Sequence, residues 1–342
     1  MACKTVGAIL WGVVAWWLLS GAAAAQTRIP FDPNSYTSLA PADSADTIAP
    51  GTKITLQNWR QYRRFMPFGL QVLYSGKYLW HVGSSPDYTL TVGPSRHILL
   101  TRQFAQDTEK YGHQTQLVRV NTGGYDVRGY VAGLPFPNPT EPELATKVLY
   151  NTRYAYYAEM SISSFTTFII DRFLNAAAGT GEGTSWRLSH ISAPGKPVNP
   201  AYAKGYLAAI RSTITSPEEV RYLTTLSLEP DDLSVPQEFW TFLPALRRPF
   251  RLSSAARCAP VLGSDFVNDD QNDGLFFLPA DFKATFLGEH KVLNLVHAST
   301  DPAVRFNADS VVVAGSAPGW PSLCSEPGSF GMFTFWISRL YR

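Results

Sequence analysis

The sequence contains few charged residues. Only 16% of its 342 residues are charged, whereas 45% are apolar. This composition excludes an intrinsically disordered chain, because disordered segments combine low hydrophobicity with high net charge. The 29 basic and 27 acidic residues leave a net charge of +2, without the basic excess typical of nucleic-acid-binding proteins. We therefore expect a folded protein that does not bind nucleic acid.

Cysteine is also scarce, with only Cys3, Cys258 and Cys324 present. Cys3 lies in an N-terminal segment that we expect to be removed on export, which leaves two. An exported compartment permits a disulfide, and an even count is compatible with one bridge. Because sequence does not show the geometry of the two sites, a Cys258–Cys324 bridge and two separate thiols both remain open.

The common catalytic and cofactor motifs are missing. The chain has no G-x-S-x-G, H-E-x-x-H, phosphate-loop or dinucleotide-binding pattern, and its six histidines are scattered. The glycines of residues 179–183 are expected to form only a flexible loop. The acidic stretch 265–274 half resembles a calcium loop but has Ala280 at the closing position, so a solvated turn is the alternative. We assign no catalytic residue, metal or cofactor.

The N-terminus predicts export. Lys4 precedes an uncharged apolar run over residues 6–19, and a small-residue site follows at residues 22–25. This order is typical of a secretory signal peptide cleaved after Ala25. The alternative is an uncleaved membrane anchor, since residues 6–25 just reach the length of a membrane span. We expect cleavage and a periplasmic protein.

Aromatic residues make up 13% of the chain, with 25 Pro and 25 Gly, which favours a β-rich fold with many turns. Short helices are predicted at 56–66 and 141–157. Because no helices regularly separate the expected strands, an antiparallel sheet is favoured. We expect strands over residues 70–80, 116–120 paired with 125–131, 164–173, 220–228, 238–243 and 250–253.

Several stretches between residues 50 and 321 resemble an uncharacterised domain-of-unknown-function family of exported Gram-negative bacterial proteins. They are Pro50–Trp59, Gly129–Pro139, Phe242–Arg248, Ala256–Pro260 and Gly263–Asp265 with Asp269–Gly274. The family is labelled outer-membrane lipoprotein-sorting-like and grouped with the LolA/LolB-like fold. The resemblance implies an α+β, mostly β structure: an incomplete antiparallel β-barrel with a few helices plugging its hollow. No catalytic residues are established for the family.

The resemblance fades after Pro321. Family members continue further, so the likeness implies a barrel that lacks its C-terminal strands, with an exposed edge, and a Cys258 without its usual partner. The expected organisation is a signal peptide (1–25), an extended arm or linker (26–50), the β-rich domain (51–321) and an atypical tail (322–342).

The expected function is that of a periplasmic carrier or chaperone, not an enzyme, that binds a hydrophobic, lipid-like ligand in a half-barrel cavity. The resemblance implies an inner-membrane exporter of the resistance-nodulation-division type as partner. One alternative is a non-carrier interaction subunit of such an exporter, and another is a periplasmic hydrolase. The predicted ligand-binding residues are aromatic or aliphatic: Trp59, Tyr74, Trp80, Phe168, Tyr222, Leu226, Trp240 and Phe242.

Overall fold

The computed structural model describes residues 38–75, 90–94, 100–121, 123–170, 176–232, 235–253, 260, 280, 283–295, 304–307, 310–313 and 329–341. Several predicted features lie outside these residues: the signal peptide, Trp80, the two remaining cysteines and the acidic stretch 265–274.

The larger sheet has six strands that follow one another in sequence. All are antiparallel, and their order is β11-β10-β9-β8-β7-β6. The strands predicted at 164–173, 220–228, 238–243 and 250–253 all fall in this sheet, which confirms the antiparallel prediction. Its strands are β6 (Met160–Ile170), β7 (Ala176–Arg187), β8 (Tyr206–Ser216), β9 (Thr224–Pro230), β10 (Glu238–Leu243) and β11 (Arg248–Leu252).

The second sheet joins distant parts of the chain in the order β1-β12-β15-β3-β2. Its two long strands, β12 and β15, pair antiparallel along their length, and β15 comes from the tail at 322–342. The short β3 pairs parallel with β15. The strands are β1 (Ala40–Pro41), β2 (Lys53–Ile54), β3 (Leu90–Val92), β12 (Lys283–Leu295) and β15 (Ser329–Tyr341).

Two hairpins stand apart from these sheets. One pairs β4 (Gln116–Arg119) with β5 (Tyr125–Arg128), as the sequence predicts. The other pairs β13 (Val304–Asn307) with β14 (Ser310–Val313).

The helices are short. They are α1 (Phe68–Tyr74), α2 (Arg102–Tyr111) and α3 (Leu144–Arg153), with 3-10 turns η2 (Trp59–Phe65), η4 (Gly112–Gln114), η5 (Ala201–Ala203), η6 (Glu218–Val220) and η7 (Pro244–Leu246). The helices predicted at 56–66 and 141–157 correspond to η2 and α3. Thr101 caps α2 by accepting a hydrogen bond from the Phe104 amide at 3.4 Å.

The strand predicted at 70–80 is wrong where the structure describes it, because Phe68–Tyr74 is a helix. Met66, Leu70 and Tyr74 recur every fourth residue and belong to one core cluster. This spacing fits a helix as well as it fits the two-residue period of a strand. The buried Gln71 side chain also donates to the Met66 carbonyl at 2.8 Å, which links the helix to the preceding turn.

The loop predicted at residues 179–183 is also wrong. These glycines lie inside β7, where all three pair with β6 and where Gly181 and Gly183 also pair with β8. Gly181 is required by packing, since a Cβ there would lie 2.4 Å from the Phe165 ring.

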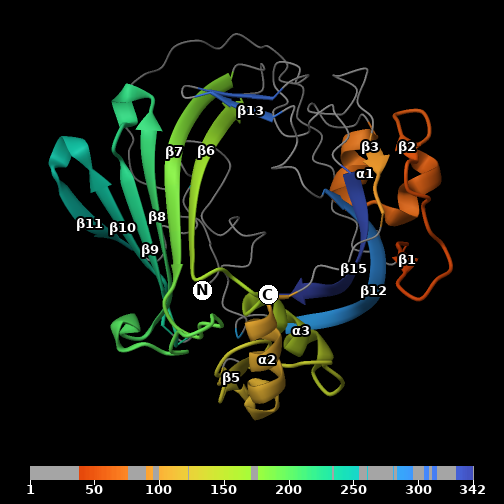
Figure 1. Ribbon diagram of the computed structural model, residues 1–342, viewed down its shortest axis with the longest axis horizontal. Coiled ribbons are helices and arrows are strands. Elements are labelled where there is room, and N and C mark those ends of the chain that lie inside the picture. Colours follow the sequence, from red (N-terminus) through yellow and green to blue (C-terminus); the bar gives the residue numbers. More distant parts are fainter. Residues whose placement is uncertain are drawn as a thin grey trace, which may run out of the picture.

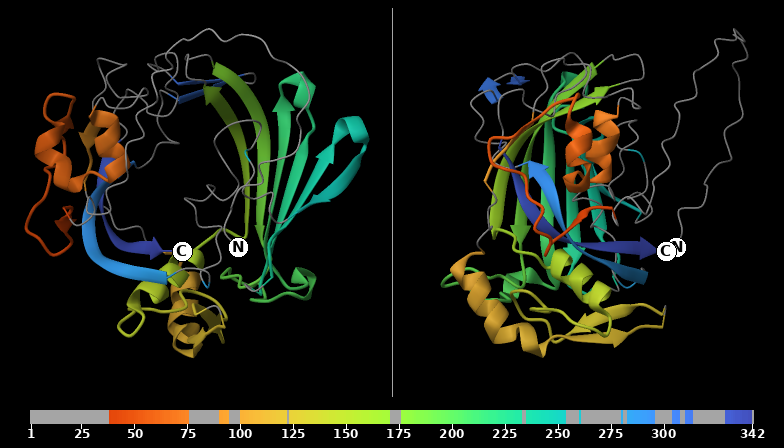
Figure 2. Two further views of the ribbon diagram at one scale, coloured as in Figure 1. Left: turned by 180° about the vertical axis from the view of Figure 1, so that it is seen from behind. Right: turned by 90° about the vertical axis from the view of Figure 1, so that its right-hand side faces the viewer.

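The two sheets stand opposite each other, with α2 and α3 below them (Figure 1). Seen from the side of β12 and β15, the six-stranded sheet lies behind these two strands (Figure 2). No described strand joins one sheet to the other. The described fold is therefore mostly β with few helices and open sheets, as expected of an incomplete barrel.

Candidate ligand-binding face

The six-stranded sheet has two faces that its register defines. We call the face that carries Ser185, Arg187 and Glu229 the inner face, and the face that carries Trp186, Leu228 and Glu238 the outer face. Glu229 forms an ion pair with Arg153 of α3, and α3 also packs against β12 and β15. The inner face is therefore the one that looks toward the second sheet.

Small and hydroxyl-bearing residues form much of the inner face. The three alternate glycines of β7, Gly179, Gly181 and Gly183, fall on this side of the sheet. The Phe165 ring lies across Gly181, and the hydroxyl groups of Ser161 and Ser185 lie 2.7 Å apart. Because short side chains project little from a sheet, the surface of this part of the inner face lies close to the backbone.

Apolar side chains surround this low region and keep part of their surface accessible. They are half-buried rather than packed into a core: Phe165, Ile210, Ile214, Phe239 and Leu243. Partly exposed apolar side chains that gather on one face are typical of a surface that binds an apolar partner.

Three predicted ligand-binding residues lie together on the outer face. Leu226 is directly opposite Trp240 in the β9–β10 pairing, and Phe242 is two residues further along β10. All three are half-buried. Phe168 lies in β6 opposite Ala178, a position that belongs to the same face, and only its backbone is described. Whether these residues contact a ligand remains a prediction.

The other predicted residues lie elsewhere. Trp59 and Tyr74 are buried in the core cluster beside the second sheet, with ring centroids 6.0 Å apart. Tyr222 is 54% exposed in the turn between β8 and β9, where the Arg221 guanidinium lies 4.8 Å from its ring centroid. The structure thus does not bring the predicted set into one site.

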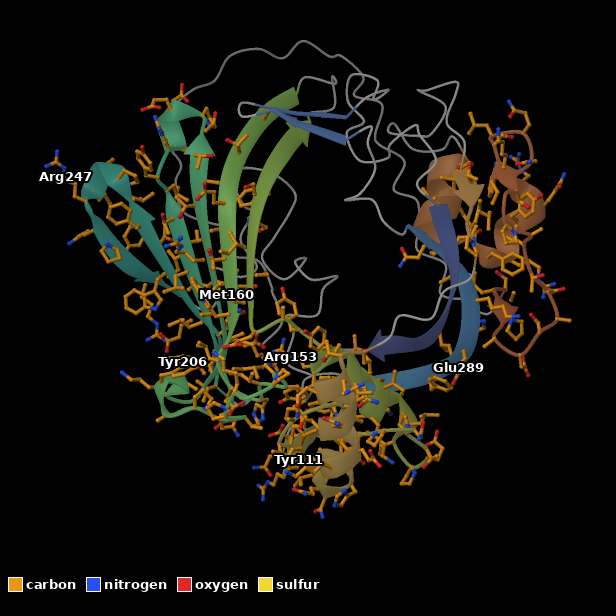
Figure 3. The ribbon with its side chains drawn as sticks, in the orientation of Figure 1. Tyr111, Arg153, Met160, Tyr206, Arg247 and Glu289 are labelled. Atoms are coloured by element: carbon orange, nitrogen blue, oxygen red, sulfur yellow. The ribbon has the colours of Figure 1, made fainter. Side chains whose placement is uncertain are left out.

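A buried polar cluster closes the lower end of the inner face, where Figure 3 shows Arg153. Its members are Arg153 and Glu229, Arg187, Tyr130, Tyr154, His190 and Asp231. Burial lowers the pKa of Arg153 to about 10 and also lowers the pKa of Arg187. Burial raises the pKa of Tyr130 to about 12. The Tyr130 and Tyr154 rings are tilted by 38° with centroids 4.1 Å apart, and the Arg187 guanidinium lies 6.0 Å from the Tyr154 ring centroid.

His190 connects three segments of the chain. Its Nδ1 lies 2.6 Å from the Val131 carbonyl oxygen, and its Nε2 lies 2.7 Å from Oδ1 of Asp231. The Val131 carbonyl can only accept, so Nδ1 donates to it, while Nε2 faces the Asp231 carboxyl group. The backbone of His190 has a φ of 53°, so the close contacts hold it in a left-handed conformation.

Both ring nitrogens of His190 are thus engaged by these two contacts. His290 likewise has both ring nitrogens 3.3 Å from backbone carbonyl oxygens, of Leu39 and Leu287. In the part of the chain that the structure describes, no three potential metal ligands cluster. No described helix has the length and apolarity to span a membrane.

No sequence pattern predicted this polar cluster. His190 and Asp231 are 41 residues apart, and no motif connects them. The Pro-rich segment over residues 133–139 follows Tyr130 and Val131, which contact His190. Asn151 of α3 orders it by donating to the Phe136 carbonyl at 2.7 Å and accepting from the Phe136 amide at 2.9 Å.

These features define a mostly β protein with two open, facing sheets and a helical, polar base. The chain belongs to the family described as "Protein of unknown function (DUF1329)", whose model matches residues 53–296. This confirms the resemblance on which the sequence analysis relied.

Two solved structures are similar over part of the chain. One is a domain described as an outer membrane lipoprotein-sorting protein, from Vibrio parahaemolyticus, with 16% identity and a TM-score of 0.34. The other is a DUF1329 family protein from Desulfovibrio piger, with 17% identity and a TM-score of 0.33. Each alignment covers 43% of this chain and 55% of the other, so the match spans little more than half of either solved chain. No curated protein matches the sequence.

Proposed function

We propose that this protein is a carrier that binds a hydrophobic, lipid-like molecule on the inner face of the six-stranded sheet and does not transform it. The observation that carries the proposal is the inner face itself. There, half-buried Phe165, Ile214 and Phe239 surround a floor of glycine and serine and look toward a second sheet. An elongated apolar ligand would cover the exposed parts of these side chains.

The energetics favour a ligand with a long apolar portion. Burying one methylene contributes ~0.8 kcal/mol, so about ten methylenes contribute roughly 8 kcal/mol before ordering costs are subtracted. Affinity near the micromolar range corresponds to about 8 kcal/mol of net binding free energy. Acyl chains, which supply more methylenes than this minimum, therefore fit the proposal better than small apolar solutes do.

The outer face offers a second candidate surface, because Leu226, Trp240 and Phe242 are also half-buried and share one side of the sheet. The two faces can be separated by experiment, since neighbouring strands carry comparable aliphatic residues on opposite sides. Ile210 of β8 is on the inner face and Leu226 of β9 is on the outer face, and both are half-buried.

The test measures uptake of a fluorescent long-chain fatty acid by detergent-free protein carrying either Ile210→Asn or Leu226→Asn. We expect Ile210→Asn to weaken binding by about tenfold, equivalent to ~1.4 kcal/mol, and Leu226→Asn to leave it nearly unchanged. The opposite result would move the ligand to the outer face. A folded wild-type protein that takes up no probe at micromolar concentration would overturn the proposal.

Export and partnership belong to the same proposal. We expect the periplasmic form to begin at Gln26, which N-terminal sequencing of protein from a periplasmic extract would show. Partnership with an exporter of the resistance-nodulation-division type, implied by the family resemblance, is tested by co-purification of such an exporter from solubilised inner membranes. Binding to an exporter without lipid uptake would favour the interaction-subunit alternative.

A further inference from the structure

The two edges of the six-stranded sheet differ in how they are protected. The β11 edge is five residues long and contains Arg248, Pro249 and Arg251. Short strands with charged residues and proline are the usual devices that keep a sheet edge from pairing with another chain. The β6 edge is eleven residues long and contains no charged residue, proline or glycine. The residues of β11 therefore disfavour pairing with another strand, whereas the residues of β6 permit it.

The β6 strand also presents apolar side chains to water. Ile162 is 74% exposed and Met160 is 53% exposed, and both lie on the outer face. Among the described strands, β6 pairs with β7 alone. A long, uncharged edge with exposed aliphatic residues has the features of a strand that is completed by another strand.

The residue pattern of β6 points to the partner. We propose that β6 pairs antiparallel with β6 of a second copy of this chain, with Phe165 on the two-fold axis. In this register apolar positions of the outer face meet apolar positions, and hydroxyl-bearing positions meet hydroxyl-bearing positions. The outer-face pairs are Met160 with Ile170, Ile162 with Phe168, and Ser164 with Thr166.

Each of these three cross-strand pairs is of a kind that stabilises a sheet. Aliphatic and aromatic side chains directly opposite each other across an antiparallel pair, and Ser or Thr opposite Thr, stabilise a sheet. An edge that pairs with its own copy about a two-fold axis must be complementary to itself. An edge that pairs with an unrelated segment has no such requirement. Because β6 carries no charge, bringing two copies together creates no like-charge pair in the strands.

Sedimentation velocity on the full-length protein tests the proposal, with Ile162→Lys as the disrupting variant. Ile162 is largely exposed, so the substitution does not alter the core. We expect a dimer for the wild type and at least a tenfold weaker dimer for Ile162→Lys. Leu246→Lys is the matched control, because Leu246 is 54% exposed in η7, outside β6, and we expect it to dimerise as the wild type does.

A cross-link tests the register. Phe165 is the only residue of β6 that would lie opposite its own copy, so Phe165→Cys should form an intermolecular disulfide on mild oxidation, and peptide mapping should identify a 165–165 linkage. Cα atoms directly opposite in an antiparallel pair lie within disulfide range. A monomeric wild type, or a dimer that Ile162→Lys leaves intact and that yields no 165–165 linkage, would overturn the proposal.

Discussion

The guanidinium of Arg153, at the end of α3, pairs with the carboxylate of Glu229 in β9, and their side chains are only 9% and 13% exposed. Burial lowers the pKa of Arg153, which shows that its environment disfavours an isolated charge. The pair therefore joins the helical base to the inner face of the sheet and depends on both partners.

Removing one partner of this pair should be strongly destabilising. We expect Arg153→Met to lower the free energy of unfolding by about 3–5 kcal/mol, because Glu229 is left buried without its counter-charge. Urea denaturation measures this loss. The double variant Arg153→Met with Glu229→Leu should lose less than Arg153→Met alone.

An exposed ion pair provides the control. Arg221 and Glu218 are 3.1 Å apart with side chains 43% and 81% exposed, and such pairs contribute little. Arg221→Met should therefore leave the urea midpoint unchanged within error. If Arg153→Met were as neutral as Arg221→Met, the helical base would not be held as described.

The His190–Asp231 pair predicts a particular pH dependence. Burial by itself raises the pKa of Asp231, but the hydrogen bond and charge of His190, together with Ser189 and Arg187, lower it below its ordinary value of 3.8. A carboxylate whose pKa is lowered by folding stabilises the native state above its unfolded pKa. That contribution is lost as the pH falls toward the folded pKa.

We therefore expect Asp231→Asn to reduce stability by a constant amount from pH 7 to about pH 5, and the difference from wild type to shrink below about pH 4. Urea denaturation at several pH values checks this. The exposed Asp46, which pairs with Arg64 at the surface, supplies the comparison variant Asp46→Asn with a smaller effect. A difference for Asp231→Asn that widened on acidification would contradict the lowered pKa of Asp231.

The sequence predicted β6, β9, β10 and β11 of the larger sheet, because these segments alternate or are rich in β-branched and aromatic residues, but it missed β7 and β8. β10 begins and ends at the predicted residues, Glu238 and Leu243. The strand predicted at 220–228 begins too early, because Tyr222 has a φ of 66° and belongs to the turn that precedes β9. Local pattern thus located strands but could not detect a backbone conformation that the turn geometry imposes.

The candidate site was harder to predict. Register decides which side chains face the second sheet, and a shift of one residue exchanges the faces. Leu226 and Trp240 share a face, but only α3 and its Arg153 identify the other face as the inner one. The polar cluster was missed because its members meet only in the folded chain.

The glycines of β7 should be intolerant of larger residues. We expect Gly181→Val to lower the free energy of unfolding by about 1–3 kcal/mol, because the added atoms would overlap the Phe165 ring and the Thr213 carbonyl oxygen, which lies 2.8 Å from a Cβ at this position. Thermal or urea denaturation measures the change. Gly69→Ala in α1 meets no atom within 4 Å and should be neutral or slightly stabilising.

Asn151 should be specifically required to order the Pro-rich segment. Asn151→Ala removes both hydrogen bonds to Phe136, leaving a partly buried amide and carbonyl unpaired, with an expected loss of about 1–3 kcal/mol. Limited proteolysis should then cut within residues 133–139 faster than in wild type. Asn151→Asp keeps the acceptor but loses the donor, and an effect as large as that of Asn151→Ala would contradict the two-bond arrangement.

Native mass spectrometry of the protein, purified from the periplasm without detergent, tests the carrier proposal most directly. We expect a bound lipid of defined mass that is depleted in the Ile210→Asn variant and retained in Leu226→Asn. A folded protein that carries no lipid, and that takes up none when incubated with a long-chain fatty acid, would contradict it.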